Sequence, residues 1–149
     1  PKDARLTKSC VNLEAMTPHS DILIDSNVII DIIGDDITWK DWSVNALTSL
    51  KSVFVNSIIF AELCYLKSSP SEVEKLLDRL EIGYREVPKE GLFLAARAYK
   101  IYRQRGGNKT APLPDFFIGA HAASVNVAIL TRDTNRYQTY FPEVELIAP

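Results

Sequence analysis

The sequence predicts a three-layer α/β/α sandwich with a mainly parallel central sheet. From residue 21 onward, short runs rich in β-branched residues alternate with longer segments of helical periodicity. Strands that alternate with helices usually pair in parallel, because each helical crossover brings the chain back to the same edge of the sheet. In sheets of this class, ligands bind at the carboxyl ends of the strands.

The first half of the chain contains two strands and four helices in this interpretation. We expect strands at 22–25 and 53–55, helices at 26–33 and 45–52, and a helical hairpin made of 57–67 and 70–80. Ser57 is the expected N-cap of the first hairpin helix, and Pro70 suits the first turn of the second. Glu72 and Glu74 favour the positive end of that second helix.

The second half continues the alternation. We expect a strand at 84–87, a long helix at 90–104, a helix at 115–124, a strand at 127–130 and a closing edge strand at 144–147. Gly106, Gly107 and Asn108 end the long helix, since these residues favour the conformations that follow a helix C-terminus.

Residues 1–20 lack this periodicity, and we interpret them as an N-terminal extension that precedes one domain at 21–149. Residues 1–15 are polar and patternless, which favours a vector-derived segment with Met16 as the natural start. The 149 residues, 46% of them apolar and 24% charged, suit one domain with a well-formed core.

Charge and cysteine content narrow the class of protein. A formal charge of −2 argues against binding nucleic acid through overall positive charge, although a local basic face can still do so. Cys10 and Cys64 have no close metal-ligand spacing with each other or with His19 and His121, which favours a reduced, cytoplasmic protein. No apolar run approaches the roughly 20 residues of a membrane helix, so no membrane partner is expected.

Four acidic residues are candidate catalytic groups and metal ligands. Asp25 and Asp133 follow strands, where the sheet edge forms a ligand crevice. Glu62 has only apolar helical neighbours, and a buried carboxylate without a partner is costly, which favours a bound cation. Asp115 lies in the first turn of an apolar helix. Taken singly, Asp25 is also explained as a helix cap, Asp115 as a favourable first-turn charge and Asp133 as a turn residue.

Other polar residues are given lesser roles. Asn27 and Thr131 are expected to support the acids through hydrogen bonds. His121 lies among glycine and alanine and is expected to be a packing or surface histidine. Asp31, Asp35 and Asp36 are expected in a solvated helix end and loop. The chain has no phosphate-binding glycine loop, no His-Glu-x-x-His and no Gly-x-Ser-x-Gly motif, so carboxylates are its main chemical resource.

Four segments, taken in order, resemble the acidic motifs of PIN domains. They are IDSNVIID at 24–31, FAEL at 60–63, LPDFFIGAHA at 113–122 and LTRD at 130–133. The resemblance covers residues 21–147 and is closest to the VapC toxins of toxin–antitoxin systems. Ser26 stands where the family usually has threonine, and it keeps a hydroxyl group.

The resemblance implies a PIN-like fold and a Mg²⁺- or Mn²⁺-dependent endoribonuclease. It carries Asp25, Glu62, Asp115 and Asp133 over as the catalytic, metal-binding acids, with Asn27 and Thr131 in support. It also implies an RNA substrate, a homodimer and a cognate antitoxin that blocks the acidic pocket.

A basic segment offers an approach surface for RNA. It supplies five positive charges and no acid between residues 97 and 109: Arg97, Lys100, Arg103, Arg105 and Lys109. Arg132 and Arg136 are expected to extend it. The same charges are equally well explained as a solvated helix face that favours the C-terminal end of the helix dipole.

Two other functions fit parts of the pattern. A non-catalytic RNA- or protein-binding module can use the same fold, because fold does not fix function. A haloacid-dehalogenase-type phosphatase also places an aspartate at the end of its first strand, but it needs a second aspartate where this chain has Asn27.

Overall fold

The computed structural model describes residues 21–149. The expectation that residues 1–15 are vector-derived, and that Met16 is the natural start, lies outside these residues. The described part contains five strands: β1 (Ile22–Ile24), β2 (Val53–Val55), β3 (Gly83–Tyr84), β4 (Ile129–Leu130) and β5 (Leu146–Ile147).

The five strands form one sheet in the order β3-β2-β1-β4-β5, and every neighbouring pair is parallel. The central strand β1 pairs with β2 through Ile22 and Val53, and with β4 through Leu23 and Ile129. All three residues of β1 are buried, as expected for a strand covered on both faces. The predicted parallel sheet is confirmed.

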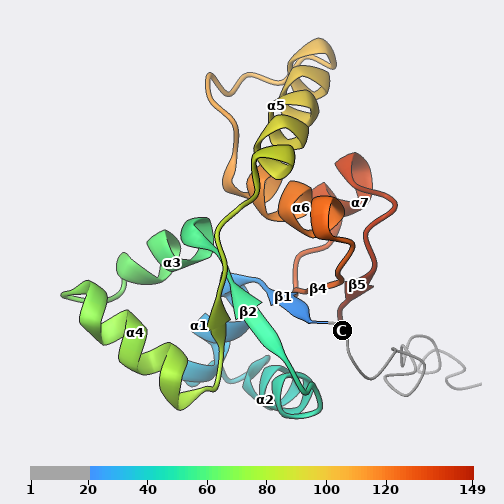
Figure 1. Ribbon diagram of the computed structural model, residues 1–149. Coiled ribbons are helices and arrows are strands. Elements are labelled where there is room, and N and C mark those ends of the chain that lie inside the picture. The colour runs from blue at the N-terminus through green and yellow to red at the C-terminus, as the bar shows by residue number, and fades with distance from the viewer. Residues whose placement is uncertain (1–20) are drawn as a thin grey trace, which may run out of the picture.

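Seven helices are found in the described residues. They are α1 (Ser26–Ile33), α2 (Lys40–Thr48), α3 (Ser57–Cys64), α4 (Pro70–Arg79), α5 (Lys89–Gln104), α6 (Pro114–Val125) and α7 (Asn135–Tyr140). The chain moves outward from β1 to β3 in one direction and then from β4 to β5 in the other. Right-handed crossovers therefore place α1–α4 on one face of the sheet and α5–α7 on the other (Figure 1). This is the predicted three-layer sandwich.

Several predicted boundaries were wrong. The N-cap of α3 is Asn56 rather than Ser57, because the Asn56 side chain accepts hydrogen bonds from the backbone N–H groups of Ile58 and Ile59. The helix α2 begins at Lys40, five residues before the predicted start, and it ends at Thr48. The hairpin of α3 and α4 is confirmed, with Pro70 in the first turn of α4 as predicted and Ser69 as its N-cap.

The helix α7 was not predicted. It is six residues long and mostly polar, and only Tyr137 of its side chains is buried. A segment of fewer than two turns shows too little periodicity for sequence to reveal. It packs against α6. Gly119 of α6 permits this packing, since a Cβ there would lie 2.2 Å from a ring carbon of Phe141. Among the described residues, no helix is both long enough and apolar enough to cross a membrane.

Candidate active site

The carboxylate of Asp25 lies at the carboxyl end of β1 and is the most heavily hydrogen-bonded acid of the group. Its Oδ1 accepts from the backbone N–H of Ser26 at 2.8 Å, so it also caps α1. Its Oδ2 accepts from the Thr131 hydroxyl at 2.9 Å and from the Tyr137 hydroxyl at 2.9 Å. The amide of Asn27 adds a longer contact of 3.3 Å. The helix-cap explanation is therefore correct, and it does not exclude a second role.

Burial dominates the charge state of Asp25. Only 5% of the residue is exposed. Removal from water raises the pKa of its carboxyl group, and the nearby charge of Asp133 raises it further, although the hydrogen bonds from Thr131 and Tyr137 oppose the shift.

The loop after β4 is bound to the start of α1 by side-chain hydrogen bonds. The Asn27 amide nitrogen donates to Thr131 Oγ1 at 3.2 Å, and Asn27 Oδ1 accepts from the backbone N–H of Arg132 at 3.1 Å. The backbone N–H of Asp133 donates to Thr131 Oγ1 at 3.1 Å. Asn27 and Thr131 thus lie where the sequence predicted support for the acids, while the side chain of Asp133 is exposed.

Glu62 projects from α3 and carries a buried oxygen with no partner. Its Oε1 is the one buried side-chain polar atom of the described residues that makes no hydrogen bond. Burial raises the pKa of its carboxyl group to about 7, and the charges of Asp25 and Asp115 contribute in the same direction. The Ser26 side chain opposes the shift. An orphaned carboxylate oxygen is rare and calls for a ligand or a proton.

Asp115 lies in the first turn of α6 and is paired with an arginine. Its Oδ2 accepts from Arg136 Nε at 3.1 Å, and both side chains are about one-third exposed, at 37% and 36%. Burial, followed by the charge of Asp25, raises the pKa of the Asp115 carboxyl group, while Arg136 lowers it. The pKa of Asp115 stays above its ordinary value even beside a cation.

Three of the four acids have a pKa that the charge of another acid of the group raises. Asp25 raises the pKa of both Glu62 and Asp115, and Asp133 raises that of both Asp25 and Asp115. The structure therefore brings the four predicted acids into one charged region. In residues 21–149, however, no three Asp, Glu, His or Cys side chains lie close enough together to hold a metal ion as they stand.

The acidic residue of α1 was wrongly expected in solvent. Asp31 is only 2% exposed, and both of its oxygens accept from the Arg132 guanidinium, at 2.7 and 2.9 Å. The Ser43 hydroxyl also donates to Asp31 at 3.1 Å, and Arg132 lies over the Trp39 ring, 5.3 Å from its centroid. Arg132 is therefore held within the protein and does not extend the basic surface in this conformation.

Tyr137 is the residue near the site that sequence reasoning missed. It is 1% exposed, and its pKa is raised well above the ordinary value by burial and by the charges of Asp25, Asp115 and Glu62. The only sequence signal was an aromatic residue four positions after Asp133, and a lone aromatic residue usually indicates packing.

His121 is a packing histidine, as predicted. It is 2% exposed, lies edge-on to Phe54 at 5.5 Å between ring centroids, and has Nδ1 at 3.1 Å from the amide nitrogen of Asn56. Because Asn56 Oδ1 already accepts two backbone bonds as the α3 cap, its amide nitrogen must face the histidine as a donor. This arrangement favours neutral His121.

The five predicted basic residues lie on α5 and the segment that follows it, and all are exposed. Figure 1 shows α5 and this segment extending away from the sheet. Arg103 donates to the carbonyl oxygens of Gly107 and Lys109 at 3.0 and 3.1 Å, so it also stabilises the loop. Tyr102 of α5 contacts Phe116 of α6 at 5.6 Å between ring centroids, which connects the basic segment to the first turn that carries Asp115.

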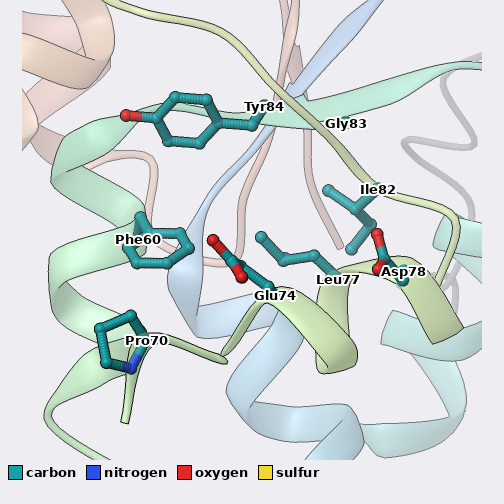
Figure 2. Close-up of a pocket in the computed structure, with 8 residues that line it drawn as sticks. All are labelled: Phe60, Pro70, Glu74, Leu77, Asp78, Ile82, Gly83 and Tyr84. Carbon is teal, nitrogen blue, oxygen red and sulfur yellow. The ribbon is translucent and has the colours of Figure 1, made fainter. Parts of the chain in front are cut away.

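A groove of about 500 Å³ lies elsewhere, between α3, α4 and β3. Figure 2 shows its lining residues, among them Phe60, Leu77 and Tyr84, with two carboxylates, Glu74 and Asp78, on α4. None of the four predicted acids lines it. The two groove acids are exposed, unlike Asp25 and the buried oxygen of Glu62.

Comparison with known proteins agrees with this geometry. The PIN domain family profile matches residues 22–142, a span that includes all four acids and Tyr137. No curated protein is similar enough in sequence to be matched.

Many solved structures share the fold, and three of them illustrate the similarity. VapBC2 from Rickettsia felis, bound to a promoter DNA fragment, superposes with a TM-score of 0.63 and 16% identity over 86% of this chain and 98% of that chain. DNA-bound VapBC from Salmonella typhimurium superposes with a TM-score of 0.64 and 16% identity, over 87% of this chain and 98% of that chain. FitAcB from Neisseria gonorrhoeae superposes with a TM-score of 0.60 and 23% identity, over 85% of this chain and 96% of that chain. Because the family match covers most of the chain and its acidic residues, this protein belongs to the PIN domain family.

Proposed function

We propose that this protein is a Mg²⁺- or Mn²⁺-dependent endoribonuclease that hydrolyses RNA phosphodiester bonds. The observation that carries the proposal is the unpartnered Oε1 of Glu62, buried beside the charges of Asp25 and Asp115. Mutual repulsion among these groups is what a bound divalent cation would relieve. Four carboxylates are also the hard oxygen ligands that Mg²⁺ and Mn²⁺ prefer.

The four acids retain free ligand positions. Oδ1 of Asp25 accepts one hydrogen bond and so keeps a lone pair, while Oε1 of Glu62 accepts none. Oδ2 of Asp115 accepts a hydrogen bond from Arg136, and Oδ1 of Asp133 accepts one from the backbone N–H of Asn135. Among the residues that the structure describes, the other oxygen of each of these two carboxylates accepts none. We assign metal binding to these four acids, which would need to draw together around the ion, since they lie apart in this conformation.

When bound, such a cation supplies an activated water and offsets charge on the phosphate. The protein contributes the arrangement around it. The hydroxyls of Thr131 and Tyr137 donate hydrogen bonds to Oδ2 of Asp25. The backbone N–H of Ser26 donates to the other oxygen, Oδ1, at the end of β1. Asn27 holds the loop that bears Asp133 against α1 through the Arg132 backbone. Because these hydrogen bonds already hold Asp25 and the Asp133 loop in position, less rearrangement is needed when substrate and metal bind.

The basic residues of α5 and its following loop are the proposed RNA approach surface: Arg97, Lys100, Arg103, Arg105 and Lys109. The assignment is supported by the aromatic contact of Tyr102 with Phe116, which joins α5 to the segment that carries Asp115. RNA bound along this surface would therefore meet the acids at its end. Binding through phosphates makes the affinity fall as salt rises.

We further propose that the protein is the toxin of a VapBC-type toxin–antitoxin pair and acts in the cytoplasm. Support comes from the family match and from structural similarity to VapBC complexes that span nearly the whole of those chains. A cognate antitoxin that covers the acidic pocket, and a homodimeric toxin, are parts of this proposal.

The non-catalytic alternative predicts different behaviour. A binding module would leave RNA intact at any metal concentration and keep its affinity for RNA or a protein partner when Asp25 and Asp115 are changed. The phosphatase alternative loses support, because Asn27 bonds to Asp25, Thr131 and Arg132 and is committed to holding the loop.

RNA cleavage tests the proposal. Wild type should cleave single-stranded RNA with Mn²⁺ or Mg²⁺, and Asp25→Asn and Asp115→Asn should each lower the rate by more than about 100-fold, beyond the effect of residues that only orient a ligand. Asp78→Asn is the matched control, since it changes an exposed acid of the groove and should cleave like wild type. Equal cleavage by all variants would refute the assignment, and release of phosphate from small monoesters would favour the phosphatase.

A further inference from the structure

Two arginines lie beside the acidic region, and they are held very differently. Arg132 makes two hydrogen bonds of 2.7 and 2.9 Å to buried Asp31 and lies over the Trp39 ring. Arg136 makes one hydrogen bond of 3.1 Å, through Nε, to Asp115. Within residues 21–149, its two terminal nitrogens have no hydrogen-bond partner.

The position of Arg136 is nevertheless defined. Its guanidinium lies 5.7 Å from the ring centroid of Phe116 and 6.0 Å from that of Tyr102, so two aromatic faces restrict its movement. Its backbone belongs to α7, next to Tyr137, which is anchored on Asp25. Arg136 therefore lies between the acids and the basic α5 segment, with 36% of its side chain exposed.

Arg136 and Asp115 are joined by a single hydrogen bond at a partly exposed position. The guanidinium of Arg136 compensates the charge of Asp115 in this conformation. A divalent cation bound by Asp115 would take over that compensation and weaken the hold on Arg136. A planar guanidinium with free N–H groups is well matched to two oxygens of a phosphate.

We propose that Arg136 binds the phosphate of the RNA substrate at the metal-loaded acidic site, having occupied Asp115 as a temporary counter-ion before the metal arrives. This rests on the proposed ribonuclease function and adds a substrate-contacting residue to it. A phosphate-binding role and a role in orienting Asp115 predict opposite effects of removing Arg136. Metal affinity should stay equal or rise in the first case and fall in the second.

Arg136→Gln tests the assignment with two binding measurements. Titration of Mn²⁺ without RNA should show an affinity equal to or higher than that of wild type, since a competing cation has left Asp115. Binding of a fluorescent single-stranded RNA, with Ca²⁺ in place of Mg²⁺, should weaken about 10- to 100-fold, the usual value of a charged hydrogen-bonded contact. The slope of log affinity against log salt should fall by about 0.7, as for the loss of one phosphate contact on a single strand.

Two further variants serve as controls. Arg79→Gln makes the same charge change at an exposed arginine in the last turn of α4 and should leave RNA affinity near the wild-type value. Arg136→Lys keeps the charge but loses the forked donors, so its RNA affinity should lie between those of wild type and Arg136→Gln.

Each contrary result has its own meaning. Weaker Mn²⁺ binding by Arg136→Gln would make Arg136 an orienting residue for Asp115 and overturn the proposal, as would unchanged RNA affinity. An equal loss of RNA affinity in Arg79→Gln would show that the effect comes from overall positive charge. That result would also overturn the proposal. If wild type itself neither binds Mn²⁺ nor cleaves RNA, the ribonuclease function fails, which is a distinct outcome.

Discussion

The hydroxyl of Tyr137 donates to Oδ2 of Asp25 across 2.9 Å, although the two residues are 112 positions apart in the chain. Both side chains are buried, with 1% and 5% exposed. The contact joins α7 to the carboxyl end of β1, and so connects the last helix of the fold to its central strand.

Removing this contact should cost both stability and activity. In Tyr137→Phe the ring is retained and one of several donors to Asp25 is lost, so the free energy of unfolding should fall by about 1 kcal/mol. Urea denaturation measures this change, and RNA cleavage should slow as Oδ2 loses a fixed partner. Tyr140→Phe is the control, because the Tyr140 hydroxyl makes no hydrogen bond within the described residues, and it should change neither quantity. Equal effects in the two variants would contradict a specific role for the Tyr137 hydroxyl.

Glu62 should make the metal-free protein less stable as pH rises. Its pKa, ordinarily 4.5, is raised to about 7 in the folded state, so the folded protein holds the proton more tightly than the unfolded chain does. The stability that protonated Glu62 contributes is present below pH 4.5 and is lost as pH rises through about 7. Thermal melting of Glu62→Gln without metal should lack this decline.

Addition of Mg²⁺ at pH 8 extends this test. It should raise the melting temperature of wild type more than that of Glu62→Gln, because only wild type has the carboxylate to be neutralised. Identical melting curves for the two proteins with and without Mg²⁺ would argue against Glu62 as a ligand.

His121 should give the opposite pH dependence. Burial, and then the charge of Arg85, lower its pKa in the folded protein. The stability contributed by neutral His121 is present above the unfolded pKa of about 6.5 and is lost as pH falls toward the lowered folded value. Because this window overlaps that of Glu62, the melting curves are best measured in the Glu62→Gln background, where His121→Gln should remove the remaining loss toward low pH. Persistence of that loss would place its origin in another group.

The buried pair of Asp31 and Arg132 should matter more than a surface pair. Asp31→Asn leaves the guanidinium without its charged partner, and the free energy of unfolding should fall by about 2 to 3 kcal/mol, since Arg132 is only partly exposed. Asp35→Asn is the control: its pair with Lys40 is exposed, and asparagine tolerates the left-handed backbone at this position, so the change should stay within about 0.5 kcal/mol. Chemical denaturation of both variants decides the comparison.

The sequence by itself determined the layers and the parallel sheet, and it predicted the four acids as the site. Strand and helix periods are local properties, and the ordered motifs around Asp25, Glu62, Asp115 and Asp133 can be read without coordinates. The family match agrees with that interpretation.

Only the tertiary structure decided which groups hold the acids in place. The bonds of Asp25 to Thr131 and Tyr137, and of Asp31 to Arg132, join residues more than 100 positions apart, and no local pattern encodes such pairs. The sequence showed Asp31 as one of several aspartates near a helix end and Arg136 as one more surface cation. Packing alone buried the first and placed the second between two aromatic rings, beside Asp115.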